Sequence, residues 1–121
     1  MASSIPLFVY GTLKRGDVRA PLLEGQRFLG ETATVPLYRL FNTGSYPAMV
    51  EAQPLALDGV SIRGELWRVD RACLARLDVE EGVDEGLYER RLIELDDGQR
   101  AWTYLFLHSI QGMADCGAHW R

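Results

Sequence analysis

The sequence predicts an α+β fold, a small mixed β-barrel with one or two short helices. Five to seven short segments are rich in β-compatible residues and only one has the pattern of a true helix, so the elements do not alternate as in a βαβ protein. Several expected strands carry apolar residues on both faces, which a closed or nearly closed barrel explains because closure removes exposed strand edges. We expect residues 1–121 to form one domain with its core over about 5–107, followed by a tail, 108–121.

The first expected strand is the apolar run 5–10, which breaks at once into a loop bounded by Gly11 and Gly16. Such a loop exposes successive backbone N–H groups at a strand tip, which suits a carboxylate or a phosphate, although an ordinary turn is the more common explanation of this spacing alone. The two glycines have the spacing of a P-loop, but Asp17 and Val18 stand where that motif needs Lys and then Ser or Thr. This excludes a Walker-type nucleotide site and leaves a small carboxylate-bearing ligand open.

The next part of the chain is expected to contain short, irregular elements. Pro21 starts or breaks a helical turn over 18–23. Pro47 indicates that its strand lies at an edge or is irregular, and residues 51–58 read as a surface loop. We expect strands here over 28–35, 38–41 and 46–50.

The second half contains the clearest helix signals. A strand is expected over 61–69, where the central Gly64 indicates a bend or a close backbone approach. Asp70 is a good N-cap for a helix over 71–77, which buries one apolar side, and Gly82 is a plausible C-terminal cap.

The last two expected strands form a hairpin. They span 88–95 and 101–106, and Asp97-Gly98 between them is a strong signal for a tight hairpin turn. The tail has no clear period and therefore no predicted element.

Composition argues against several classes of partner. The net charge is −4 and basic residues occur only as isolated pairs, so we expect no nucleic acid partner. No apolar run approaches the roughly 20 residues that span a bilayer, and the first residues lack the pattern of a signal peptide, so we expect a cytoplasmic monomer without a membrane partner. Cys73 fits a small core residue. Cys116 and His119 are too few ligands for a metal site, so none is expected.

Glu81 is the acidic residue expected to face inward. If the helix reaches position 81, Glu81 follows Leu77 by four residues and Leu74 by seven, so it lies on the apolar stripe, with Glu80 nearer the border and Val79 outward. A carboxylate facing the interior is costly unless it is paired or its pKa rises, and perturbed carboxylates tend to mark functional sites. Structural ion pairs also perturb pKa values, so a structural role for Glu81 stays open.

Four segments, taken in order, resemble the gamma-glutamylcyclotransferase-like family. They are the Tyr-Gly-Thr-Leu segment 8–13, the Gly44 and Tyr-Pro-Ala segment 44–48, the Gly-Glu-Leu-Trp strand 64–70, and the Leu-Asp-x-x-Glu-Gly segment 77–82 with Tyr-x-Arg at 88–90. Each segment is weak alone, but four in the right order are specific. The compact length and Thr12-Leu13 look more like the gamma-glutamylamine cyclotransferase branch than the branches that act on glutathione.

This resemblance implies an α+β barrel with a cavity at its mouth and no cofactor. It implies that Glu81, and not Glu80, is the catalytic general acid/base. Tyr88 either lines the cavity or fills the core, and Arg90 is expected to be structural. The residues expected to bind substrate, largely through backbone groups, are Tyr10, Gly11, Thr12, Leu13 and, if it lines the cavity, Tyr88.

The implied reaction is the intramolecular cyclisation of a gamma-glutamyl amine or amino acid. The substrate's own α-amine attacks its γ-carbonyl, which gives 5-oxoproline and a free amine without a protein nucleophile. Two alternatives stay open, because function resides in the site and not in the scaffold: a non-catalytic binding module for gamma-glutamyl compounds or amino acids, and an interaction protein with a relic pocket. The sequence does not specify the leaving amine.

Overall fold

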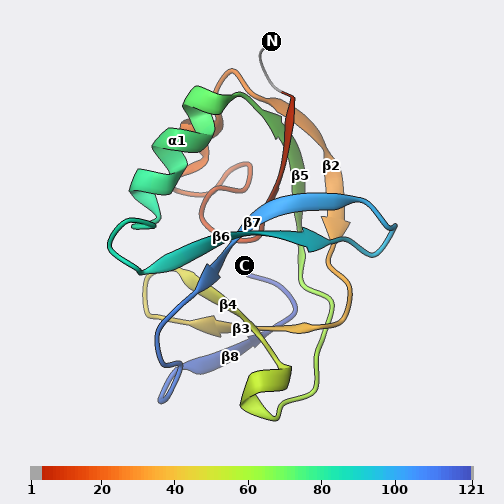
Figure 1. Cartoon of the computed structure of the whole chain (residues 1–121), viewed down its shortest axis with the longest axis vertical. Coiled ribbons are helices and arrows are strands. Elements are labelled where there is room, and N and C mark those ends of the chain that lie inside the picture. Colours follow the sequence, from red (N-terminus) through yellow and green to blue (C-terminus); the bar gives the residue numbers. More distant parts are fainter. Residues whose placement is uncertain (1–3, 121) are drawn as a thin grey trace.

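The computed structural model describes residues 4–120, which form an α+β structure with two β-sheets (Figure 1). The α+β class is confirmed. The helices are η1 (Ala20–Leu23), η2 (Gln53–Leu55) and α1 (Arg71–Glu80), of which η1 and η2 are short 3-10 helices. The strands are β1 (Ile5–Val9), β2 (Arg27–Ala33), β3 (Tyr38–Asn42), β4 (Pro47–Glu51), β5 (Arg63–Val69), β6 (Tyr88–Glu94), β7 (Arg100–Phe106) and β8 (Ala114–Gly117).

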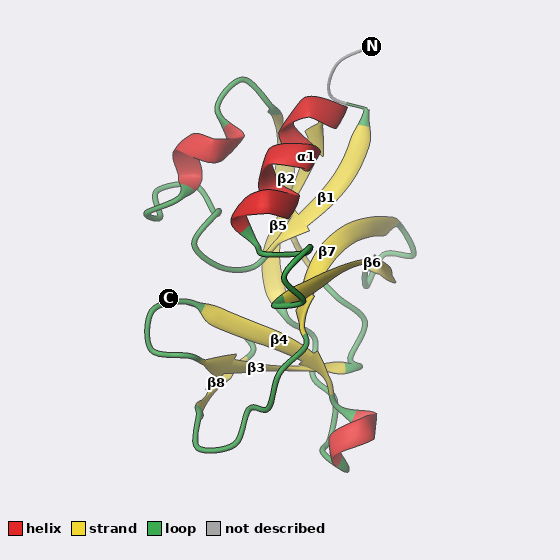
Figure 2. Cartoon of the chain, turned by 60° about the vertical axis from the view of Figure 1, so that its left-hand side comes forward, coloured by secondary structure: helices red, strands yellow, loops and turns green. Residues whose placement is uncertain are grey.

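The two sheets do not close into a single barrel, so the expected closure is wrong. The large sheet has the order β2-β5-β1-β7-β6 and the small sheet the order β4-β3-β8 (Figure 2). Among the described residues, an isolated bridge from Tyr38 to Val60 joins the start of β3 to the segment before β5, and one from Thr34 to Leu95 joins the ends of β2 and β6, the two edge strands of the large sheet. Pro36 lies between β2 and β3 and has no N–H to continue a ladder, so the chain leaves the large sheet there.

Strand β1 is apolar on both faces because each face of the large sheet is covered. β1 pairs antiparallel with β5 and parallel with β7, so it lies at the centre of the sheet. Leu7 and Val9 join the core cluster under α1, whereas Phe8 and Tyr10 join the cluster shared with the small sheet. The helix and the small sheet therefore bury the two faces of β1, which barrel closure was expected to do.

Helix α1 begins after Asp70 as its sequence predicts, but it runs to Glu80, beyond the expected end at Leu77. The side chain of Asp70 accepts a hydrogen bond of 2.7 Å from the Cys73 N–H, which satisfies one of the free amides of the first turn. Leu77 is fully buried, whereas Val79 is 74% exposed. Gly82 has a φ of +66°. This is the left-handed conformation that commonly ends a helix and that glycine adopts most readily. None of the helices formed by residues 4–120 is long and apolar enough to cross a membrane.

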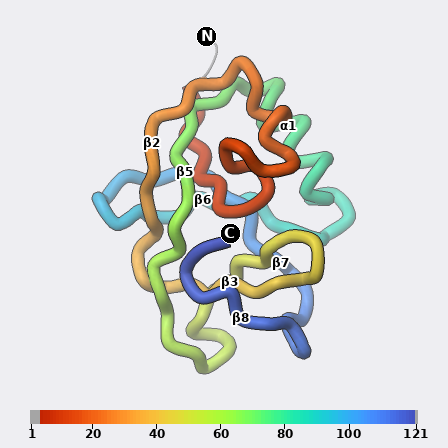
Figure 3. The backbone as a smooth tube through the Cα atoms, turned by 180° about the vertical axis from the view of Figure 1, so that it is seen from behind, coloured from red at the N-terminus to blue at the C-terminus, as the bar shows by residue number. Residues whose placement is uncertain are grey.

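The segment after β7 forms a strand that the sequence does not predict. β8 pairs antiparallel with β3, which leaves β4 at the other edge of the small sheet, as the proline in β4 indicates. Beyond β8 the chain passes close to the first loop (Figure 3), where the Lys14 Nζ donates to the Trp120 carbonyl at 2.5 Å. The C-terminal part of the described chain thus packs beside the loop that follows β1.

Gly64 lies where β5 approaches β1 too closely for a side chain. A Cβ at this position would stand 2.3 Å from the Val9 carbonyl oxygen and 2.6 Å from the ring of Phe8. The bend or close approach expected at Gly64 is therefore a close approach. It holds the end of β1, and hence the start of the first loop, against β5.

We predict that Gly64→Ala lowers the free energy of unfolding by about 1–3 kcal/mol or more, because the added methyl group overpacks the contact with β1. Urea denaturation measures the loss. Arg63→Ala, one residue earlier and exposed, serves as the control and should change stability by no more than about 0.5 kcal/mol. Equal stability of Gly64→Ala and the unsubstituted protein would contradict the close approach.

Candidate active site

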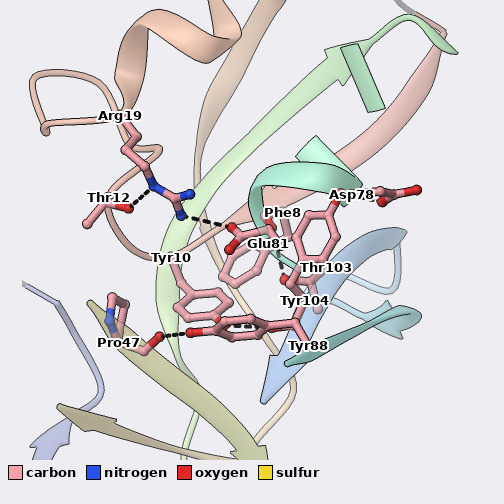
Figure 4. Close-up of polar contacts among 10 residues, drawn as sticks. All are labelled: Phe8, Tyr10, Thr12, Arg19, Pro47, Asp78, Glu81, Tyr88, Thr103 and Tyr104. Atoms are coloured by element: carbon pink, nitrogen blue, oxygen red, sulfur yellow. Dashed lines mark hydrogen bonds and ion pairs between the residues drawn. The ribbon is translucent and has the colours of Figure 1, made fainter. Parts of the chain in front are cut away.

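A small pocket opens where β1 ends, between the loop that follows it and the C-terminal end of α1 (Figure 4). The space between its walls, open solvent at the mouth included, is about 330 Å³. The pocket is lined by Phe8, Val9, Tyr10, Gly11, Thr12, Leu13, Arg19, Tyr46, Pro47, Glu81, Tyr88 and Tyr104. The structure therefore brings together all the residues that the sequence proposes for substrate binding and the acid proposed for catalysis.

The loop after β1 presents backbone donors to this pocket. The Lys14 N–H donates to the Gly11 carbonyl at 3.0 Å and the Arg19 N–H to the Thr12 carbonyl at 2.8 Å, which fix the turn. The hydrogen bonds within residues 4–120 leave the N–H groups of Thr12 and Leu13 without an acceptor. Two adjacent amides of this kind can bind a carboxylate. The side chain of Leu13 is buried in the core cluster, so Leu13 can serve a ligand only through its backbone.

Gly11 has a packing reason to be glycine. A Cβ there would stand 2.4 Å from the ring of Pro47, which leads into β4. The loop and the small sheet thus meet at van der Waals distance at the edge of the pocket.

Glu65 braces the far end of the loop. It lies in β5 and is only 6% exposed. Its carboxylate accepts hydrogen bonds from the Arg15 backbone N–H at 3.0 Å, from the Arg15 Nε at 3.3 Å and from the Trp67 Nε1 at 3.1 Å. The sequence pattern marks Glu65 only as part of a strand, because its partner loop lies 50 positions earlier. We assign it a structural role in holding the loop.

Glu81 occupies the turn that closes α1 and points into the pocket. Its backbone N–H donates to the Leu77 carbonyl at 2.8 Å, so it continues the helical register and shares the buried face with Leu77. Glu81 is 8% exposed, whereas the neighbouring Glu80 is exposed. The orientation expected from the helical period is therefore the one observed.

Arg19 is the partner of Glu81 and is a site residue that the sequence reasoning missed. Its Nη2 donates to Glu81 Oε1 at 3.0 Å and its Nε donates to Thr12 Oγ1 at 2.7 Å (Figure 4). Burial raises the pKa of Glu81 above its ordinary value, and the adjacent Arg19 charge offsets part of this rise. The only signal in the sequence is a basic residue shortly after the glycine-bounded loop, and 62 positions separate it from Glu81.

Three of the four tyrosines that line the pocket, Tyr10, Tyr88 and Tyr104, present their rings, because backbone or carboxylate groups already engage their hydroxyls. The Tyr10 hydroxyl donates to the Tyr104 carbonyl at 2.6 Å, the Tyr88 hydroxyl to the Pro47 carbonyl at 2.7 Å, and the Tyr104 hydroxyl to Asp78 at 2.8 Å. Burial raises the pKa of Tyr10 and of Tyr88, which keeps both neutral. Tyr88 is 3% exposed and also lines the pocket, so it fills both of the roles that the sequence left open.

Within the part of the chain that the structure describes, no three His, Cys, Asp or Glu side chains gather in an arrangement that could hold a metal ion. Cys73 lies buried among core side chains, and its Sγ faces the Leu22 carbonyl at 3.7 Å. The chemistry that the pocket itself offers is one carboxylate, one guanidinium and two backbone donors.

The raised pKa of Glu81 predicts a pH dependence of stability. A carboxyl whose pKa is higher folded than unfolded binds its proton more tightly in the folded state, so its contribution to stability is largest at low pH and is lost as the pH rises through the folded pKa. We therefore expect Glu81→Gln to gain stability relative to the unsubstituted protein between about pH 4 and pH 7. Urea denaturation across this range measures the difference.

Glu80→Gln controls for the loss of one negative charge at an exposed neighbouring position. A stability difference for Glu81→Gln that shrinks as the pH rises would show that the folded protein favours the ionised carboxylate, contrary to the burial seen here.

The comparisons with known proteins identify a family for this chain. The family model described as gamma-glutamyl cyclotransferase, AIG2-like, matches residues 7–121. A Vibrio cholerae relative whose name contains gamma-glutamylcyclotransferase is 36% identical over 113 residues, or 92% of this chain and 91% of that protein. The gamma-glutamylcyclotransferase family protein YtfP of Escherichia coli K12 is 30% identical over 107 residues, or 88% and 87%.

The fold is also that of a solved relative. The crystal structure of an AIG2-like protein from Mus musculus matches with a TM-score of 0.78 at 22% identity, over 95% of this chain and 87% of that one, which shows the shared fold alone. Because the family model covers nearly all of the described residues, the chain belongs to the AIG2-like gamma-glutamylcyclotransferase family.

Proposed function

We propose that this protein cyclises a gamma-glutamyl amine or gamma-glutamyl amino acid to 5-oxoproline and releases the free amine. Membership of the family supports cyclotransferase activity in general. The observation that carries the specific proposal is the placement of Glu81. Its carboxylate is held out of water in the same pocket as the two free amides of the Thr12-Leu13 turn.

In the proposed reaction, the α-amine of the substrate attacks its own γ-carbonyl carbon. A new C–N bond closes the five-membered ring, and the original amide C–N bond breaks. One proton leaves the attacking ammonium and one reaches the departing nitrogen, so a single carboxylate can accept the first and deliver it to the second. The proposed reaction uses neither water nor a protein nucleophile.

The pocket supports this reaction chiefly by positioning. The substrate must curl until its amine meets its carbonyl, and holding reacting groups in such a geometry is worth up to about 7–11 kcal/mol in favourable cases. The N–H groups of Thr12 and Leu13 supply fixed donors for the substrate carboxylate or for the oxyanion that forms at the γ-carbon. The rings of Tyr10 and Tyr88 line the cavity, whereas their hydroxyls are already hydrogen-bonded to backbone carbonyl groups.

The raised pKa of Glu81 suits the proton transfer. A carboxyl that holds its proton more firmly than usual is a better base toward an ammonium group. The proposed branch is the gamma-glutamylamine one, and the leaving amine is the part of the substrate that extends toward the pocket mouth.

The competing proposal is a binding module that holds a gamma-glutamyl compound without turnover. The same amides and the same Arg19–Glu81 pair would bind such a ligand. Membership of the gamma-glutamylcyclotransferase family favours the enzyme.

We predict that the protein releases 5-oxoproline from at least one member of a panel of gamma-glutamyl amines and gamma-glutamyl amino acids. Glu81→Gln should lower kcat by about 10²–10⁴-fold, because it removes the acid/base and keeps the side-chain volume. Chromatographic detection of 5-oxoproline measures the rate, and circular dichroism confirms that the variant is folded.

Glu80→Gln is the matched control, since it makes the same change at the exposed neighbour, and it should keep most of the activity. A folded Glu81→Gln variant with near-normal turnover would disprove the role of Glu81. Tight binding of the panel without any 5-oxoproline would favour the binding module.

A further inference from the structure

Arg19 lines the pocket but has no place in the proton transfers described above. Its guanidinium bridges the loop and the helix end, through Thr12 on one side and Glu81 on the other. Arg19 and Glu81 are the two charged side chains among the described residues that line the pocket. Their side chains are 29% and 10% exposed, so their charges interact in a partly desolvated setting.

The pair matches the charges of an α-amino-acid head group. A zwitterionic head carries a carboxylate and an ammonium on the same carbon, and the pocket carries a guanidinium and a carboxylate with N and O atoms 3.0 Å apart. When the head group lies beside this ion pair with its charges in the opposite order, each charge of the ligand faces a side chain of opposite charge. The carboxylate of the ligand then faces Arg19, and its ammonium faces Glu81.

The surroundings favour this order over the reverse one. The free N–H groups of Thr12 and Leu13 lie on the loop that Arg19 contacts through its Nε, so donors for a carboxylate gather on that side of the pocket. A guanidinium has five N–H donors in a planar fork, and the contacts with Thr12 and Glu81 use two nitrogen atoms of the three. A second carboxylate can therefore bind to Arg19 while the bond to Thr12 is kept.

We propose that Arg19 binds the α-carboxylate of the substrate and so directs its ammonium onto Glu81. This inference rests on the proposed function and adds a specificity-determining residue to it. Substrate binding exchanges the Arg19–Glu81 ion pair for two new ones, in which Glu81 faces the group whose proton it must take. A substrate without the α-carboxylate loses this orientation even though its reacting atoms are unchanged.

The test compares two amides that differ only in that carboxylate. L-γ-Glutamyl-n-butylamide and 4-aminobutyryl-n-butylamide both release n-butylamine on cyclisation, and the second has hydrogen in place of the α-carboxylate. The measured quantity is the ratio of their kcat/KM values. Loss of Arg19 also removes the partner of Glu81, but this affects both amides, so the ratio isolates the contact with the substrate carboxylate.

We predict that Arg19→Gln lowers the ratio by about 10²-fold, as expected when one partner of a partly buried charge pair is removed. Arg19→Lys should give an intermediate ratio, because it keeps the charge and loses the planar fork. This second variant also keeps the test valid if Arg19→Gln folds poorly. Arg76→Gln is the control, since Arg76 is exposed on α1 and lies outside the pocket lining, and its ratio should match that of the unsubstituted protein.

An Arg19→Gln variant that keeps the unsubstituted ratio would overturn the assignment of Arg19. If the unsubstituted protein cyclises neither amide and no member of the gamma-glutamyl panel, the proposed function fails instead. Calorimetric binding of L-γ-glutamyl-n-butylamide to the unsubstituted and Arg19→Gln proteins then decides the role of Arg19 separately. Equal affinities would overturn it, and an affinity at least about 10-fold weaker in the variant would support it.

Discussion

The site depends on a carboxylate, Glu81, that is held out of water beside a single guanidinium. Burial raises the free energy of the ionised carboxylate, and the 3.0 Å contact with Arg19 recovers only part of this cost, so the pKa of Glu81 stays above its ordinary value. A carboxylate with a raised pKa readily accepts a proton from an ammonium group that binds beside it. The pocket therefore holds a base whose strength is set by its surroundings, next to donors that suit an anion.

The scaffold explains how so small a chain keeps this arrangement. β1 is covered on both faces, by α1 and by the small sheet, so the loop at its end starts from a rigid point. Glu65 holds the far end of the loop through two hydrogen bonds from Arg15, and the close contact at Gly64 fixes β5 against β1. α1 then places Glu81 opposite the loop, with the helix end capped by Gly82. Catalytic positioning within fractions of an ångström requires this kind of support.

Local sequence patterns predict much of this structure because they reflect local physics. The cap at Asp70, the left-handed Gly82, the buried Leu77 and the inward Glu81 all follow from the helical period and from backbone sterics. The α+β class follows from the number and spacing of strands. The closure of a barrel does not follow, because apolar residues on both faces of β1 are equally explained by a helix on one side and a second sheet on the other.

The features that the sequence does not reveal depend on long-range contacts. The Arg19–Glu81 pair joins residues 62 positions apart, and the bond from Tyr10 to the Tyr104 carbonyl joins residues 94 positions apart. β8 has little apolar character, and its pairing with β3 is decided by the rest of the fold. Periodicity cannot report such contacts, since it describes which face of an element is buried and not what lies opposite.

The most direct test of the account is a crystal structure of the protein with 5-oxoproline bound. The account predicts that the carboxylate of this product contacts the N–H groups of Thr12 and Leu13 and the guanidinium of Arg19, with the ring nitrogen within hydrogen-bond distance of Glu81. A product molecule bound in the pocket with its ring nitrogen turned away from Glu81, or bound elsewhere on the protein, would contradict it.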